Sequence, residues 1–154
     1  MATSLLQVDT QRMKKESNNN RKSSQFSNRV LARTVVFQLL FLEDMNPGNP
    51  EEWNNEFLSE KLPAHEEIHD FARQLITGVQ ENKPELDQRI EQVSKNWSLA
   101  RMSVTDRNIL RLALYELTYI KTPKPVVINE AIELAKKFGS AESSAFVNGI
   151  LDRF

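Results

Sequence analysis

The chain has 154 residues, of which 40% are apolar and 27% are charged, and it contains no Cys. This length suits one domain with a sizeable core, and the composition is that of an ordinary globular protein. Without Cys, a disulfide framework and thiol chemistry are excluded. No apolar run approaches the roughly 18 residues that a membrane helix needs, and the start lacks the features of a secretory signal, so we expect a cytoplasmic protein with no membrane partner.

Charge is unevenly distributed along the chain. Residues 1–33 carry seven Lys or Arg against two Asp or Glu, residues 34–94 carry four against thirteen, and residues 95–154 carry nine against six. A basic end beside an acidic middle suits a protein with two partners of opposite charge. A solvated surface with a basic tail explains the same pattern, so charge alone assigns no partner.

Residues 1–25 are rich in Ser, Asn and Gln and contain little to bury, so they are expected to form a disordered basic tail. Its cations, Arg21 and Lys22 among them, are candidates for loose screening of phosphate charge. Order is expected from about Ser27, where a long, densely apolar run shows helical spacing and ends at a break over 46–50.

Apolar periodicity predicts six further helices separated by turn residues. They span about residues 51–61, 64–82, 85–93, 103–120, 126–139 and 141–153. No alternating strand pattern and no internal repeat is present. We therefore predict an all-α protein of about seven helices, with a tail at 1–25 and one helical domain at 26–154.

The segment 103–120 is expected to be the centre of that domain. Ser103 reads as a helix N-cap with Asp106 in the first turn. The helix is apolar over most of its circumference, with Ile109, Ala113 and Leu117 on one stripe and further apolar residues beside it. Such a helix should be buried by its neighbours rather than lie on a surface.

His65-Glu66-Glu67-Ile68-His69 matches the H-E-x-x-H pattern, in which two His bind zinc and the Glu activates water. These are the only two His in the chain, so a third ligand would have to be a distant carboxylate. The motif also opens a helix in an acidic turn, where carboxylates are favoured without any metal. We predict no metal site and no cofactor here.

Little else in the sequence indicates catalysis. Four Gly leave nothing from which to build a phosphate-binding loop, and no Ser has a plausible His partner. Asp and Glu are expected mostly on exposed helix faces. A binding surface is the remaining interpretation, and the protein is predicted not to be an enzyme.

Arg29 and Arg33 lie four residues apart, hence on one helix face, and an arginine pair there can grip phosphates or stack on bases. Phe146 lies at the edge of the last apolar stripe and could stack on an unpaired base, although a core position is the alternative. Gly149 inside a helix costs up to about 1 kcal/mol relative to Ala, which indicates a close approach of some backbone, whether a ligand's or a neighbouring helix's.

Three stretches resemble one family. The runs Val126–Gly139 and Phe146–Asp152 closely resemble the transcription antitermination factor NusB, and Ile109–Leu117 is similar to the central helix of that family. Ala32-Arg33, followed by Phe37–Phe41, is similar to its first helix. The resemblance covers roughly residues 27–153 without a large gap.

The resemblance implies two packed helical bundles, here at about 27–82 and 84–154. It implies binding of boxA-type single-stranded RNA of nascent, chiefly ribosomal RNA, transcripts, together with the ribosomal protein NusE and the RNA polymerase elongation complex. By matching position, Asp106 would contact NusE. The residues expected on the RNA side, including the two tail cations, are Arg21, Lys22, Arg29, Arg33, Phe41, Glu142 and Phe146.

Two alternatives remain open from the sequence. The same fold is attached to ribosomal RNA cytosine methyltransferases, so a stand-alone RNA-binding module in ribosomal RNA maturation is one. The other is a dimerising structural module, because some relatives of NusB self-associate over the RNA face; a homodimer is therefore a possible assembly.

Overall fold

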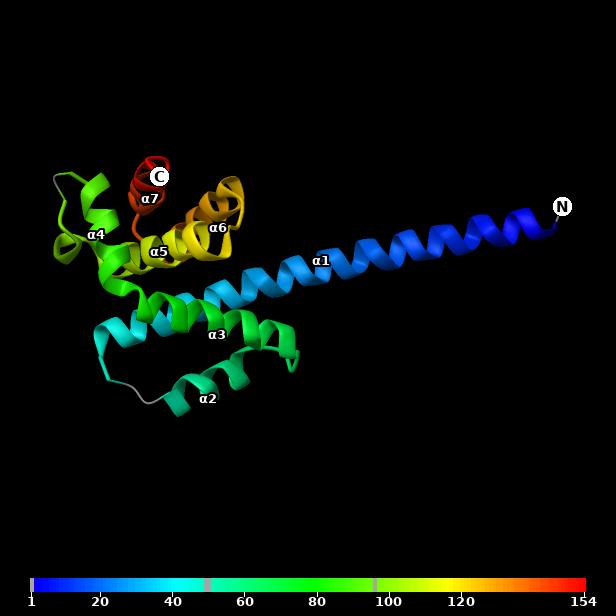
Figure 1. Ribbon diagram of the computed structural model, residues 1–154, viewed down its shortest axis with the longest axis horizontal. Coiled ribbons are helices and arrows are strands. Elements are labelled where there is room, and N and C mark those ends of the chain that lie inside the picture. Colours follow the sequence, from blue (N-terminus) through cyan, green and yellow to red (C-terminus); the bar gives the residue numbers. More distant parts are fainter. Residues whose placement is uncertain (1, 49–50, 96) are drawn as a thin grey trace.

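The computed structural model describes the backbone of residues 2–48, 51–95 and 97–154, and side chains from residue 7 onward. Within these ranges the chain is helical and has no strand, which confirms the all-α prediction (Figure 1). The helices are α1 (Ala2–Met45), α2 (Glu51–Lys61), α3 (Glu66–Glu81), α4 (Lys83–Val93), α5 (Val104–Tyr115), α6 (Lys124–Phe138) and α7 (Ser143–Leu151). A 3₁₀ turn, η1 (Leu99–Arg101), precedes α5, and a π-helical turn, η2 (Glu116–Ile120), follows it.

α1 differs from the sequence prediction of a disordered tail. Its 44 residues form one helix of about 66 Å, and its N-terminal half projects far from the body (Figure 1). We call residues 7–26 the arm; every side chain in it is exposed. The arm buries nothing, as its composition indicates. It is helical because it continues a helix that the body already nucleates, so it adds residues without the nucleation penalty.

α5 is the centre of the body, as predicted. All residues from Asn108 to Tyr115 are buried, and α5 packs against α1, α3, α4, α6 and α7. Its N-terminus is capped as expected, since the Ser103 side chain accepts a hydrogen bond from the Asp106 amide at 3.0 Å. Because α1 contacts both α3 and α5, it touches both parts of the body, and the division at 27–82 and 84–154 stays a prediction.

Apart from the start of α1, the predicted boundaries lie within a few residues of the observed ones, and the main remaining difference is at the end of α5. There the backbone changes to the π-helical turn and ends at Lys121, which has a φ of 59°. Of the break predicted at 46–50, residues 49 and 50 lie outside the described residues. No helix in the described part of the chain is long and apolar enough to cross a membrane.

Gly78, rather than Gly149, lies where two helices approach each other closely. A Cβ on Gly149 would meet nothing within 4 Å, so the prediction that a neighbouring backbone of this chain approaches it closely is wrong. A Cβ on Gly78 would overlap the ring of Tyr115. The close helix approach that needs a glycine is therefore between α3 and α5.

Candidate nucleic-acid interface

Arg29 stands at the point where α1 leaves the body. Its side chain is exposed, and its guanidinium carbon lies 4.7 Å from the ring centroid of the buried Phe71 of α3. A cation over an aromatic face is attracted by the ring and loses freedom before any ligand arrives. Arg29 therefore presents a positive charge that is both oriented and open to solvent, as its predicted role requires.

Arg33 does not share that surface, and its predicted phosphate contact is contradicted by the structure. The residue is 4% exposed. Its Nε and Nη2 donate to both oxygens of Glu116 at 2.9 to 3.1 Å. A charge buried to this degree needs a partner to offset its lost hydration, and Glu116 supplies it. The expected Arg29 and Arg33 pair is thus one surface arginine and one interior arginine.

The carboxylate of Glu116 belongs to the π-helical turn and also accepts from the Thr122 hydroxyl at 3.1 Å. Glu130 of α6 faces the same region. Burial raises the pKa of Glu130, with the charge of Glu116 adding to the rise and that of Arg33 opposing it. Sequence reasoning did not assign Glu116 to this site. The feature that could have indicated it is the presence of a charged residue within the largely apolar segment 103–120.

Phe41 borders an apolar groove of about 430 Å³. It is half-buried, and its ring centroid is 6.3 Å from that of Phe37, which in turn lies 5.0 Å from that of Phe138 in α6. Such an open, aromatic-lined groove can receive a flat or apolar group. The groove is lined by Phe37, Gln38, Phe41, Leu42, Phe57, Lys61, Thr105 and Phe138.

Phe146 is half-buried in α7 and has an aromatic neighbour that sequence reasoning did not assign to the site. The indole of Trp97 is 51% exposed, and its centroid lies 6.4 Å from the Phe146 ring at an interplanar angle of 59°. Glu142, just before α7, is exposed and accepts from the Ser140 hydroxyl at 3.3 Å. Phe146 and Glu142 are thus placed at the surface, as their predicted roles require.

Arg21 and Lys22 lie on the arm, but they face different directions. Arg21, with Arg29, lines a cavity of about 900 Å³ between the arm and the start of α3, whose other wall includes Glu66 and Glu67. Lys22 does not line that cavity. Because acidic side chains share the cavity with Arg21, they reduce its attraction for a polyanion, whereas Lys22 does not face them.

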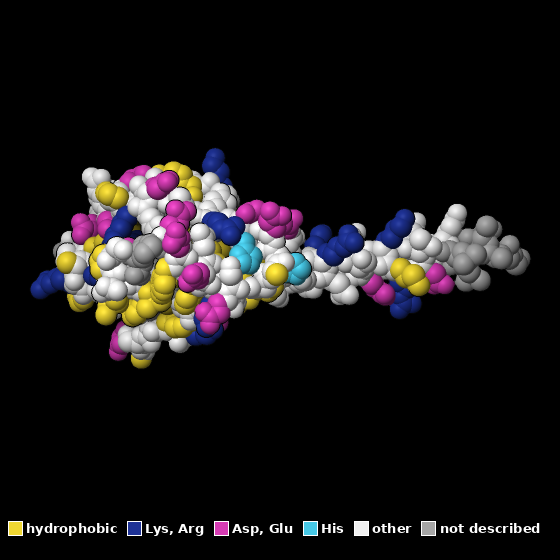
Figure 2. Space-filling view, turned by 90° about the horizontal axis from the view of Figure 1, so that it is seen from below, with side chains coloured by type: hydrophobic (Ala, Val, Ile, Leu, Met, Phe, Trp, Pro, Cys, Tyr) yellow, Lys and Arg dark blue, Asp and Glu magenta, His cyan; other side chains and the backbone are white. Residues whose placement is uncertain are grey.

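The His pair lies beside this cavity, where the arm leaves the body (Figure 2). His65 precedes α3 and lines the cavity, and His69 has its Nε2 2.9 Å from the Pro63 carbonyl oxygen. Among the residues that the structure describes, no three His, Asp or Glu groups gather as a metal set would.

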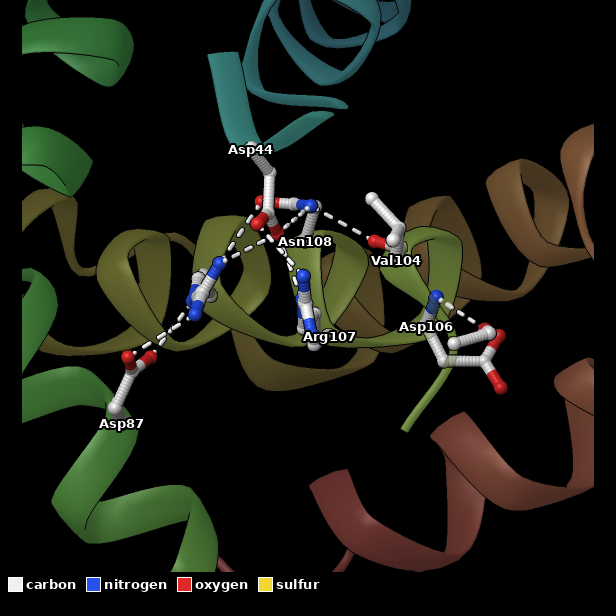
Figure 3. Close-up of polar contacts among 8 residues, drawn as sticks. Asp44, Asp87, Val104, Asp106, Arg107 and Asn108 are labelled. Carbon is white, nitrogen blue, oxygen red and sulfur yellow. Dashed lines mark hydrogen bonds and ion pairs between the residues drawn. The ribbon is translucent and has the colours of Figure 1, made fainter. Parts of the chain in front are cut away.

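A polar network joins the end of α1 to α4 and α5 (Figure 3). Asp44 accepts from Arg107 at 2.7 Å through both of its oxygens, from Asn108 at 2.8 Å and from Arg111 at 3.0 Å. Arg111 also donates twice to Asp87 of α4, at 2.7 and 3.0 Å. Burial alone raises the pKa of Asp44, but these hydrogen bonds and the arginine charges outweigh it and lower the pKa to about 2. The network sets the positions of three helices.

Asp106 stands outside that network, at the start of α5 (Figure 3). Its amide is used by the Ser103 cap, while its Oδ1 is buried and has no hydrogen-bond partner within the described chain. Ser103 is therefore the cap, and the carboxylate of Asp106 is left without a donor. The side chain as a whole is half-buried, and its contact with NusE stays a prediction.

An all-helical body that presents arginine and half-buried aromatic side chains at its surface has the groups with which proteins bind single-stranded nucleic acids. The NusB family model matches residues 30–154, and the chain is a member of the NusB family. The transcription antitermination protein NusB of Anaeromyxobacter dehalogenans is 44% identical over 127 residues, covering 82% of this chain and 89% of that protein.

Solved structures agree with this assignment. A NusB of T. maritima superposes with a TM-score of 0.73 at 41% identity, covering 81% of this chain and 88% of that one. A crystal structure of antitermination factors NusB and NusE in complex with dsRNA contains a chain that superposes with a TM-score of 0.74 at 30% identity, covering 82% and 95%. The family model begins at residue 30, so the arm lies outside the part shared with the family.

Proposed function

We propose that this protein is a non-catalytic, cytoplasmic antitermination factor that binds boxA-type single-stranded RNA of nascent ribosomal RNA transcripts together with NusE. In this role it would help to hold the elongating RNA polymerase in a termination-resistant state. The observation that carries the proposal is the likeness, over 82% of the chain, to a protein crystallised as antitermination factors NusB and NusE with RNA.

The placement of surface groups supports an RNA role along α1 and at the α7 end of the body. Arg29 and Phe41 are twelve residues apart on one helix, about 18 Å. An arginine can hold a phosphate and a ring can stack on a base. We propose RNA contacts by Arg21, Lys22, Arg29, Phe41, Glu142 and Phe146, and leave out Arg33 because its charge is already paired in the interior.

A titration of boxA-type RNA and a scrambled strand, with and without NusE, tests the proposal. We expect tighter binding of the boxA-type strand when NusE is present, and a steep loss of affinity as salt rises because phosphate contacts release counterions. Equal affinity for both strands with NusE present would refute the boxA assignment. If neither RNA nor NusE changes the thermal midpoint of the protein, the antitermination role itself fails.

A matched arginine pair sharpens the same titration. Arg29→Gln removes an exposed charge and is expected to weaken RNA binding while leaving the fold intact. Arg73→Gln also removes a half-exposed arginine, one that contacts Asn55 and Asp70 away from the proposed contacts, and should leave RNA affinity unchanged. A duplex of the same sequence serves as a third ligand. Preference for the duplex would redirect the proposal from single-stranded to double-stranded RNA.

A further inference from the structure

We propose that Phe26, flanked by Lys22 and Arg29, is an additional base-stacking position that lengthens the RNA contact along α1 beyond the part of the chain shared with the family. This inference rests on the proposed function, since it adds a contact for the same RNA. Phe26 precedes residue 30, so it lies outside the part of the chain that the family model matches.

Phe26 is the most exposed phenylalanine among the described residues, with 58% of its surface open to solvent. It precedes the buried part of α1 by only a few residues, yet it packs into none of the aromatic contacts found in the described chain. Covering this ring with a flat base costs little conformational entropy, because a phenylalanine side chain has only two torsion angles to restrict.

Its neighbours on the helix surface are cations. Lys22 lies four residues before Phe26 and Arg29 three residues after it, which places all three on one face. Lys15 lies one further heptad back along the same row. Lys22 is exposed, and Arg29 is held over Phe71 as described. Cations on either side of an exposed ring are the arrangement that binds a single strand, with phosphates on the charges and a base on the ring.

The electrostatics of α1 favour an anionic partner at this place. From residue 17 to residue 42 the helix has no Asp or Glu, and its charged residues there are Arg21, Lys22, Arg29 and Arg33. The acids of the arm, Asp9 and Glu16, lie further toward the N-terminus, where Glu16 pairs with Arg12 at 3.1 Å. Figure 2 shows the Lys and Arg side chains along the arm, with the Asp and Glu side chains toward its outer half.

The Phe26 face meets the cavity between the arm and α3 only at Arg29. Lys22 and Phe26 do not line that cavity, whereas Arg29 does. An RNA strand that covers Phe26 and Lys22 therefore has Glu66 and Glu67 near it only at its Arg29 end. Val8 lies about five helical turns before Phe26 on the same face, but the cations Lys15 and Lys22 lie between them. The exposed Met13 lies on another face, so the described part of the arm lacks the continuous apolar seam of a coiled coil.

The test compares Phe26→Ala, Phe26→Leu and Phe26→Tyr in the full chain, with NusE present, against a boxA-type strand that extends past the boxA segment. Stacking on one base is worth roughly 1–3 kcal/mol, so Phe26→Ala should weaken binding by about fivefold to one hundredfold. Phe26→Tyr should keep the affinity. Phe26→Leu should lose most of it, because leucine is apolar but has no flat face. Met13→Ala is the control for an exposed apolar residue elsewhere on the arm.

The salt dependence separates the ring from the charges. Phe26→Ala should leave the slope of log affinity against log salt unchanged, whereas Lys22→Gln should lower its magnitude by about 1, as the loss of one phosphate contact does. Equal affinity of Phe26→Ala and the parent chain, or an affinity of Phe26→Leu equal to that of Phe26→Tyr, overturns the stacking inference while the proposed function stands. If the parent chain itself fails to bind the strand, both proposals fail.

Discussion

Arg33 and Glu116 form a buried ion pair that connects α1 to the end of α5. The guanidinium and the carboxylate meet through three hydrogen bonds of 2.9 to 3.1 Å, and the two side chains are 4% and 2% exposed. The same carboxylate lies in the π-helical turn and holds Thr122. The pair therefore fixes where the first helix crosses the centre of the body, close to the point at which the arm begins.

Arg33→Ala is expected to destabilise the protein by about 3–5 kcal/mol, because it leaves the Glu116 carboxylate buried without a partner. Chemical denaturation monitored by circular dichroism measures this loss. Arg29→Ala, four residues away on the same helix but exposed, should change stability far less. A stable, folded Arg33→Ala variant that loses only RNA affinity would show that Arg33 is a surface contact for RNA and not an interior ion-pair partner.

A double variant isolates the origin of that loss. Arg33→Met combined with Glu116→Leu removes both charges together and should recover much of the stability that Arg33→Ala loses, since a buried ion pair is often replaceable by apolar residues of similar volume. If the double variant is as unstable as Arg33→Ala, the loss comes from packing around the helices rather than from an unpaired charge.

Arg29 and Arg33 show which features of the site could be predicted from the sequence and which could not. Apolar periodicity predicted the helices correctly because each helix buries a stripe that its own residues define. It could not predict that Arg33 turns inward, because its partner Glu116 is 83 residues away in the chain. Spacing of four residues places two side chains on one face, but the packing of α3 and α5 decides which part of that face is covered.

The arm illustrates a second reason. Composition predicted a disordered tail over residues 1–25. The side chains from residue 7 onward are exposed there, but the backbone is helical. The helix follows from its continuity with the buried half of α1, a property of the whole element. Phe41, Glu142 and Phe146 were expected on the RNA side through the family resemblance. In the structure Glu142 is exposed and the two rings are half-buried, and their contacts with RNA stay predictions.

Asp44 should make stability depend on acid. Its pKa is lowered from 3.8 to about 2 in the folded protein, so its contribution is fully present above about pH 4 and is lost as the pH falls toward 2. The shift corresponds to at most about 2 kcal/mol, at 1.36 kcal/mol per pKa unit. Denaturation between pH 2 and pH 6 measures it. Asp44→Asn should be less stable at pH 6 and should show a flatter dependence over this range.

The control for Asp44 is an aspartate with the same chemical change on the surface. Asp70→Asn removes an exposed carboxylate whose side chain is 70% open and whose ion pair with Arg73 is 3.5 Å long. Exposed pairs of this kind contribute little, so Asp70→Asn should follow the parent curve. An Asp44→Asn variant that also follows the parent curve would mean that the network does not depend on the Asp44 charge.

Gly78→Ala and Gly149→Ala should change stability in opposite directions. At Gly78 the added methyl overlaps the Tyr115 ring, and forcing a side chain into a packed helix contact costs about 1–3 kcal/mol. At Gly149, inside α7, the methyl meets nothing within 4 Å, so alanine should add up to about 1 kcal/mol through its higher helix propensity. Thermal unfolding of the two variants measures both effects, and a destabilised Gly149→Ala would show that its surroundings are not open.

Ser103 and Asp106 allow capping and partner binding to be separated at one helix end. Ser103→Ala removes the hydrogen bond to the Asp106 amide, and loss of an N-cap costs about 1 kcal/mol. Asp106→Asn keeps the Ser103 cap, because that hydrogen bond uses the backbone amide of residue 106. It loses only the favourable interaction of the carboxylate charge with the helix N-terminus, worth about 0.3–1 kcal/mol. If Asp106 contacts NusE, as the family resemblance implies, Asp106→Asn should weaken NusE binding although it is the milder change for folding. Isothermal titration with NusE, alongside thermal unfolding, measures both quantities. Weaker NusE binding by Ser103→Ala with Asp106→Asn unaffected would reverse the two roles, because it would mean that NusE depends on the order of the α5 terminus rather than on the carboxylate.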